Sequence, residues 1–217
     1  MWAEQAIFTS MPRRGRAGYH VVARSPGVTE AEATAVATWS PSHGALIVDA
    51  SNGTSVNFHR LPSGRLALSR TCEGPAEYSG RGERQIYTHA LIFDAKALQA
   101  MGGQPIAVYR DALALGYLRF QAEPDLVLKP VELGTVHASQ DLETWAARAR
   151  VLGLPSLESL EAQLASGEPV QLRYPGDRIA LAECLLGLLP VDMIPDASFS
   201  TSLRPSAVRP FRLALVS

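Results

Sequence analysis

The sequence is poor in the residues from which several kinds of site are built. It has two cysteines, Cys72 and Cys184, which lie far apart and form neither a C-x-x-C pair nor a zinc-binding pattern. The N-terminus lacks the basic-then-apolar order of a signal peptide. The most apolar stretch, residues 179–191, is interrupted by Glu183 and Pro190 and is too short to cross a bilayer. We therefore expect a cytoplasmic protein with free thiols and no membrane partner.

The chain also lacks an excess of charge of either sign. Its formal net charge is -1, so no overall field recruits nucleic acid or anionic lipid, and we expect no nucleic-acid partner. Lysine is scarce, with only Lys96 and Lys129, and the remaining basic residues are arginines. Hydrophobic residues make up 47% of the 217 residues, which is typical of a folded globular protein and excludes a disordered chain.

The order of predicted elements favours an α+β fold. Apolar runs and apolar–polar alternation predict strands over residues 4–9, 20–24, 45–50, 54–61, 65–72 and 85–93, with a closing strand over 211–216. Helical spacing and caps predict helices over residues 29–39, 95–101, 105–116, 141–152, 156–166 and 179–189. Strands thus dominate the first half and helices the second. We expect a largely antiparallel sheet from the N-terminal half, packed against helices mainly from the C-terminal half. The chain is expected to form one domain, residues 1–217, and a subdomain boundary, if there is one, should lie near residues 101–105.

His89 lies within the strand predicted over residues 85–93. Both faces of this strand are apolar, which indicates a central strand covered on both sides. A neutral, buried histidine with one hydrogen bond is the ordinary outcome at such a position. The alternative is a general acid or base, which would need a nucleophile or carboxylate within hydrogen-bond reach.

Two turns rich in arginine and glycine stand beside predicted strands. They are "PRRGRAG" at residues 12–18 and "SGRGER" at residues 79–84. Neither is a phosphate-binding P-loop, because no Lys-Ser or Lys-Thr pair opens a helix after it. Both are compatible with plain connections carrying solvated arginines. If the turns converge, they would form one anion-binding or partner-binding patch, lined by Arg13, Arg14, Arg16, Arg81 and Arg84.

Signatures of catalysis and of metal binding are weak. The other histidines are scattered without metal-ligand spacing, so we expect neither a metal nor a cofactor. The hydroxyl-rich segment around Phe199 predicts a core anchor whose neighbouring side chains satisfy backbone groups. An enzymatic alternative remains open, in which a hydrolase or nuclease-like protein uses His89 as general acid or base. Arg81 or Arg84 would then hold an anionic substrate.

Three blocks together resemble a known family. The first comprises "EQAIFTS" (residues 4–10) and "YHVVARSPGVT" (19–29), separated by an arginine-glycine turn. The second is "SGRGERQIYTHALIF" (79–93), and the third is "LLGLLPVDMIPDASFSTSL" (185–203), followed by "FRLALV". In this order they resemble the type 2 N-terminal domain of bacterial GTPase-associated protein 1. The positions that match the family motifs are Thr9, Ser10, Gly18, Ser25, Pro26, Gly27, Gly80, Arg81, His89, Phe199, Ser200 and Thr201.

The resemblance implies a non-catalytic adaptor encoded beside a small GTPase and a second associated protein, in a system of biological conflict or defence. The Arg-Gly turns and the region of His89 would form its recognition surface. Glu83 and Arg84 depart from the family, in which an asparagine commonly follows the second glycine of the middle block. Larger members continue into further domains, so we expect either an excised domain or a short relative.

Overall fold

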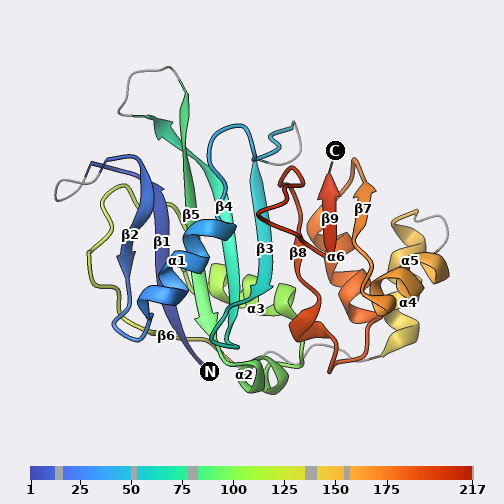
Figure 1. Cartoon of the computed structure of the whole chain (residues 1–217). Helices are drawn as coiled ribbons and strands as arrows, with labels where there is room; N and C mark the ends of the chain where they lie inside the picture. The colour runs from blue at the N-terminus through green and yellow to red at the C-terminus, as the bar shows by residue number, and fades with distance from the viewer. Residues whose placement is uncertain (13–16, 50–52, 78–82, 135–140, 154–156, 217) are drawn as a thin grey trace.

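The computed structural model describes residues 1–12, 17–49, 53–77, 83–134, 141–153 and 157–216. Within these ranges, nine strands form one mixed, mostly antiparallel sheet, and six α-helices accompany it (Figure 1). The predicted α+β fold is confirmed. Among the described residues, no helix combines the length and the apolar character needed to cross a membrane.

The sheet combines strands from both halves of the chain. Its strands are β1 (Trp2–Ser10), β2 (Tyr19–Arg24), β3 (Thr54–Arg60), β4 (Leu66–Ala76), β5 (Arg84–Phe93), β6 (Val131–Glu132), β7 (Val170–Arg173), β8 (Phe199–Ser200) and β9 (Leu213–Val216). Their spatial order is β2-β1-β5-β4-β3-β8-β9-β7, and β6 pairs with β1. Pairing is antiparallel except where β9 lies parallel to β7 and β8. The five strands of the first half therefore form an antiparallel block at one side of the sheet.

Helices cover both faces of this sheet. They are α1 (Glu30–Trp39), α2 (Ala95–Ala100), α3 (Pro105–Ala114), α4 (Leu142–Val151), α5 (Leu157–Ser166) and α6 (Arg178–Gly187), with a short 3-10 turn at Ile194–Asp196. Helix α1 packs on one face, where its Ala33 and Val36 join the core. On the opposite face, α2, α3 and α6 contribute apolar side chains to the largest core cluster.

Strand β5 lies at the centre of the antiparallel block, between β1 and β4. Its Ala90 and Ile92 pack in the cluster under α1, whereas Leu91 and Phe93 belong to the core beneath α2 and α3. Because successive side chains of a strand point to opposite faces, this pattern places apolar packing on both sides of β5. The prediction of a central strand covered on both faces is confirmed.

Two local predictions are wrong, and two short strands were not predicted. The strand predicted over residues 45–50 does not form over the described residues 45–49, where Leu46 makes an isolated bridge to Leu203 and packs against Ile86. Leu142, predicted on the buried side of its helix, is 58% exposed because it stands in the first turn of α4. Strands β7 and β8 have four and two residues, too few for a periodic signal, and were not predicted. The first residue of the helix predicted over 156–166 lies outside the described residues.

Candidate functional site

The connections β1–β2 and β4–β5 leave the sheet at the same end, at the upper left of Figure 1. The register requires this, because β5 runs antiparallel to both β1 and β4, pairing Tyr87 with Thr9 on one side and Arg84 with Ala76 on the other. We call this region the turn end; it comprises residues 10–12, 17–19, 76–77 and 83–85, together with His43. The central residues of both predicted Arg-Gly turns, including Arg13, Arg14, Arg16, Gly80 and Arg81, lie outside the described residues.

Polar contacts hold the flanks of the two connections together. Ser10 Oγ donates a hydrogen bond to Glu77 Oε1 at 2.7 Å, and the side-chain amide of Gln85 donates to the Ser10 carbonyl oxygen at 2.5 Å. Tyr19, at the start of β2, accepts a bond on its hydroxyl from the Ile86 backbone N–H at 3.0 Å. Strands β1, β2, β4 and β5 are therefore cross-linked where the turns begin.

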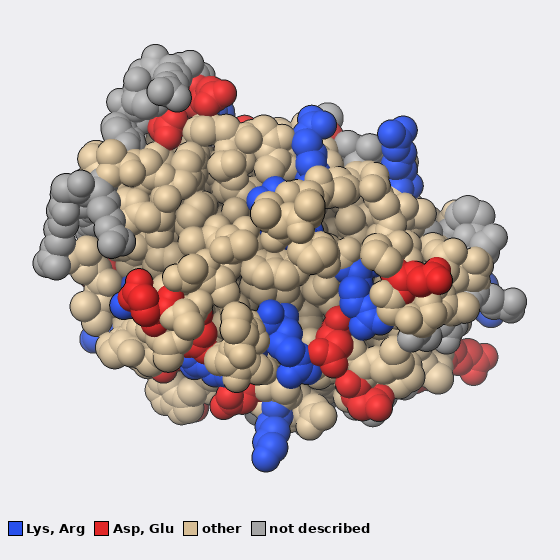
Figure 2. Space-filling view, in the orientation of Figure 1, with Lys and Arg blue, Asp and Glu red and all other residues tan. Residues whose placement is uncertain are grey.

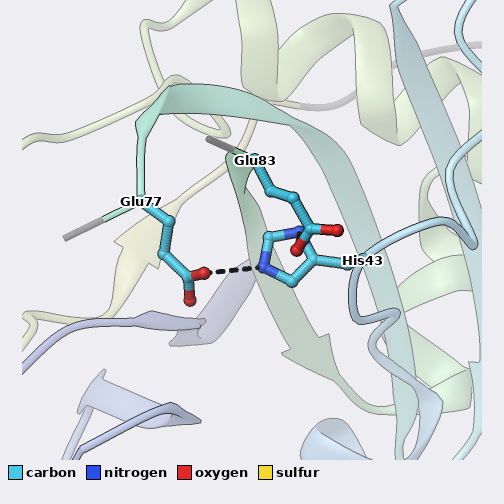
Figure 3. A group of neighbouring side chains, drawn as sticks. All are labelled: His43, Glu77 and Glu83. Atoms are coloured by element: carbon cyan, nitrogen blue, oxygen red, sulfur yellow. Dashed lines mark hydrogen bonds and ion pairs between the residues drawn. The ribbon is translucent and has the colours of Figure 1, made fainter. Parts of the chain in front are cut away.

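His43 contributes from the segment after α1 and lies between two carboxylates (Figure 3). Its Nε2 is 3.0 Å from Glu77 Oε2, and its Nδ1 is 3.5 Å from Glu83 Oε2. The hydroxyl of Tyr19 also lies 3.1 Å from Nε2. Burial raises the pKa of Tyr19; the Ile86 hydrogen bond opposes this, and the charges of the two glutamates add to the increase. Polar contacts among Tyr19, His43, Glu77 and Glu83 thus join four segments of the chain.

Arg84 is the one predicted patch arginine that lies within the described part of the chain. Its side chain is 65% exposed, and Nε lies 3.1 Å from the Gly74 carbonyl oxygen and 3.7 Å from Glu73. An exposed ion pair of this length contributes little to stability. The guanidinium is therefore available to solvent and to a partner.

His89 is on the face of the sheet that carries the main core. Its side chain is fully buried, and Nε2 lies 2.8 Å from Gln5 Oε1. Burial lowers the pKa of His89 to about 4; the backbone of Arg119 opposes this shift, and the charge of Arg70 adds to it. The ring is neutral near pH 7. The ring itself is therefore out of reach of a docked protein, and a recognition surface in the region around it stays a prediction.

An acid–base role for His89 stays a prediction, and the described geometry gives it little support. The side chain hydrogen-bonded to Nε2 is the carboxamide of Gln5, which is neither a nucleophile nor an acid. The remaining predicted element of that site, Arg84, stands at the turn end, where its neighbours are Gly74 and Glu73.

The motif residues of the first block serve the local backbone. Ser25 Oγ accepts from the Gln5 N–H at 2.9 Å, and Thr9 Oγ1 donates to the Ile86 carbonyl oxygen at 2.8 Å. After Pro26, a Cβ added to Gly27 would lie 2.2 Å from the Glu4 carboxylate, so a larger residue there requires the Glu4 side chain to move. Gly18 has a φ of +83°, in the left-handed region that glycine adopts without strain.

The motif residues of the third block anchor the C-terminal strands. Phe199 is fully buried and stacks on Phe58 with ring centroids 5.8 Å apart. The hydroxyls of Ser200 and Thr201 accept bonds from the backbone N–H groups of Leu203 and Val56. This is the role predicted for hydroxyls in this segment.

A sequence model of the family described as GTPase-associated protein 1, N-terminal domain type 2, matches residues 2–133. The matched region contains strands β1 to β6 and therefore the whole turn end. The third resembling block, residues 185–203, lies beyond the match and stays a prediction. No curated protein and no solved structure matches this chain.

The sequence does not predict that His43, Glu77 and Glu83 lie together. The histidine is more than 30 residues from either glutamate, so spacing along the chain carries no signal. Only the register of the β4–β5 hairpin and the path of the segment after α1 bring them together.

Proposed function

This chain belongs to the family of GTPase-associated protein 1, N-terminal domain type 2, and we propose that it is a non-catalytic adaptor that docks a protein partner. The partner in this proposal is the small GTPase encoded beside it, or that GTPase together with a second associated protein. The system would serve biological conflict or defence. The observation that supports the proposal is that the described flanks of both Arg-Gly turns leave the sheet at the same end, inside the matched region.

The polar contacts of the turn end support this proposal. Its base is held by the Ser10–Glu77 and Gln85–Ser10 hydrogen bonds, so the strand ends lose little freedom when a partner binds. Pro12, Glu83 and Arg84 are exposed around this base. A rigid support carrying exposed polar side chains favours specific recognition over a cleft reaction.

The charges at the turn end are mixed. Acidic side chains gather at the upper left of Figure 2, and the sequence places five arginines in the two Arg-Gly turns, residues 12–18 and 79–84. Arginine presents a planar fork that binds carboxylates in two-pronged geometry, and it is enriched in protein interfaces. Opposed charges on a partner would therefore set orientation and association rate.

We further propose that the protein acts in the cytoplasm. Cys72 and Cys184 are both free and buried. Free thiols are the usual state of cysteine in a reducing compartment.

The direct test is co-purification of the chain with the neighbouring GTPase, loaded with GDP or with a non-hydrolysable GTP analogue. The account predicts a complex in at least one nucleotide state. The double variant Arg81→Glu, Arg84→Glu should weaken that complex by about tenfold or more, since reversed charges repel at an interface. The matched control is Arg173→Glu, an exposed arginine on β7 at the opposite edge of the sheet. Absence of a complex in both states, or equal binding by the double variant, would contradict the proposal.

A further inference from the structure

We propose that His43, Glu77 and Glu83 form a binding site for a divalent first-row transition-metal ion of the Zn²⁺ type. This goes beyond the adaptor role and does not depend on it, because the ion would bind the chain in the absence of any partner. Figure 3 shows the three side chains directed toward one another from the segment after α1 and from both flanks of the β4–β5 connection.

The distances suit ligands of one ion. Each residue offers one donor atom, and the three atoms lie within 4.8 Å of one another. His43 Nε2 and Glu77 Oε2 are 3.0 Å apart, close to the spacing of adjacent ligands around an ion with bonds of about 2.0–2.2 Å. Glu83 lies on the Nδ1 side of the ring. Its side chain is 56% exposed and can change rotamer to complete the set.

The backbone fixes two negative charges in proximity. The Glu77 N–H donates to the Glu83 carbonyl oxygen at 2.9 Å, so the two residues face each other across the mouth of the hairpin. Like charges directly opposite on neighbouring strands destabilise the pairing. The Glu77 side chain is only 9% exposed. A divalent cation would bind both carboxylates and one ring nitrogen of the imidazole.

The adjacent arginine is directed away from the three ligands. Arg84 follows Glu83 in sequence, yet its Nε is directed to the Gly74 carbonyl oxygen and to Glu73. Ser10 meanwhile donates to Oε1 of Glu77, which orients the carboxylate with Oε2 toward His43. An outer hydrogen bond of this kind is how proteins hold a metal-binding carboxylate in place.

The donor set selects the class of ion. One imidazole nitrogen with two carboxylates suits Zn²⁺ and its first-row neighbours, whereas Mg²⁺ and Ca²⁺ prefer oxygen donors alone. Three protein ligands leave a position that water fills. We expect Zn²⁺ to bind more tightly than Mg²⁺ or Ca²⁺ and to tie the segment after α1 to the hairpin.

The experiment is calorimetric titration of the tag-free chain with ZnCl₂, with thermal melting as a second readout. One saturable site is expected, with a rise in melting temperature on Zn²⁺ addition and a smaller response to Mg²⁺ and Ca²⁺. Glu83→Gln, an exposed change that preserves the fold, should weaken affinity at least about tenfold, and His43→Gln should remove the site.

Matched controls separate this site from adventitious binding. His20→Gln and Glu73→Gln change a histidine and a glutamate outside the group and should leave the titration within about twofold of the unmodified chain. No saturable Zn²⁺ binding at millimolar concentration, or equal binding by Glu83→Gln and the controls, would overturn the proposal. A variant that loses Zn²⁺ binding but still forms the GTPase complex shows that the metal site is not needed for the adaptor function. A chain that binds Zn²⁺ but forms no GTPase complex contradicts the adaptor function and leaves the metal site standing.

Discussion

The hydroxyl of Ser10 donates to Oε1 of Glu77 across 2.7 Å and thereby joins the ends of β1 and β4, two strands that are not neighbours in the sheet. Strand β5 lies between them, and its Gln85 donates to the Ser10 carbonyl oxygen. Hydrogen bonds therefore hold β1, β4 and β5 together at the end of the sheet where both connections begin. The docking surface that we propose depends on this arrangement.

Removal of the Ser10 hydroxyl should loosen the turn end. Ser10→Ala removes a hydrogen bond to the mostly buried Glu77 carboxylate, so the free energy of unfolding should fall by about 1–3 kcal/mol. Urea denaturation measures this difference. Ser166→Ala, which removes an exposed hydroxyl bonded to the Gln163 carbonyl oxygen, should change stability by less than about 0.5 kcal/mol. Equal effects of the two changes would contradict the fastening role of Ser10.

His89 should behave as a packing residue. His89→Ala removes a fully buried ring and its contact with Gln5, and it should lower the free energy of unfolding by about 1–3 kcal/mol. Affinity of the folded fraction for the GTPase should not change, because the ring is not at the surface. Denaturation and binding measured on the same preparation test this. Unchanged stability with abolished binding would show that His89 has a functional role.

The ion pair between Glu32 and Arg65 should make stability sensitive to acid. Burial raises the pKa of Glu32, but hydrogen bonds from Arg65, Ser63 and Thr29 outweigh this and lower the pKa from 4.5 to about 2. The folded state thus keeps the carboxylate ionised at lower pH than the unfolded chain does. The stabilisation is complete above about pH 4.5 and is lost as the pH falls toward 2. The difference in unfolding free energy between the unmodified chain and Glu32→Gln should shrink across this window.

Arg65→Met provides the matched test of that explanation. Without the guanidinium, the Glu32 pKa should return toward its ordinary value, and the acid dependence contributed by Glu32 should flatten. An unmodified chain and an Arg65→Met chain with parallel stability curves between about pH 5 and pH 2 would be incompatible with this account.

His59 should contribute acid sensitivity at higher pH. Burial lowers the pKa of His59 from 6.5 to about 3, and neither ring nitrogen has a hydrogen-bond partner among the described residues. Between these pH values His59 is protonated in the unfolded chain and neutral in the folded chain. The free energy of unfolding therefore falls as the pH drops from about 6.5 toward 3. The ring centroids of His59 and Trp39 are 4.3 Å apart. His59→Phe keeps a ring that can stack on Trp39 and removes the titrating group. Thermal melting should show a weaker dependence on pH over this range; an unchanged slope would refute the prediction.

The sequence predicted the larger elements because their signals are local. Helical spacing and caps predicted a helix over residues 29–39, and the structure contains both hydrogen bonds of a capping box between Thr29 and Glu32 at the start of α1. The alternation through β5 indicated a strand with two buried faces, which is what its contacts show. Such signals arise from neighbouring residues and need no knowledge of the rest of the chain.

The elements and contacts that the sequence did not predict depend on residues far apart in the chain. Leu46 stands in an apolar run typical of a strand, but a strand also needs a continuous partner, and Leu46 makes an isolated bridge to Leu203. Phe199 and Ser200 form a two-residue strand that exists because β3 and β9 lie on either side. The proximity of His43 to Glu77 likewise depends on long-range packing. Residue spacing cannot show contacts of this kind.

Hydrogen–deuterium exchange on the complex with the neighbouring GTPase tests the docking surface most directly. The account predicts that partner binding slows exchange in the flanks of both connections, residues 10–19 and 76–85, while exchange in β7 at the far edge of the sheet stays unchanged. Protection confined to one connection, or concentrated at β7, would contradict a docking surface at the turn end.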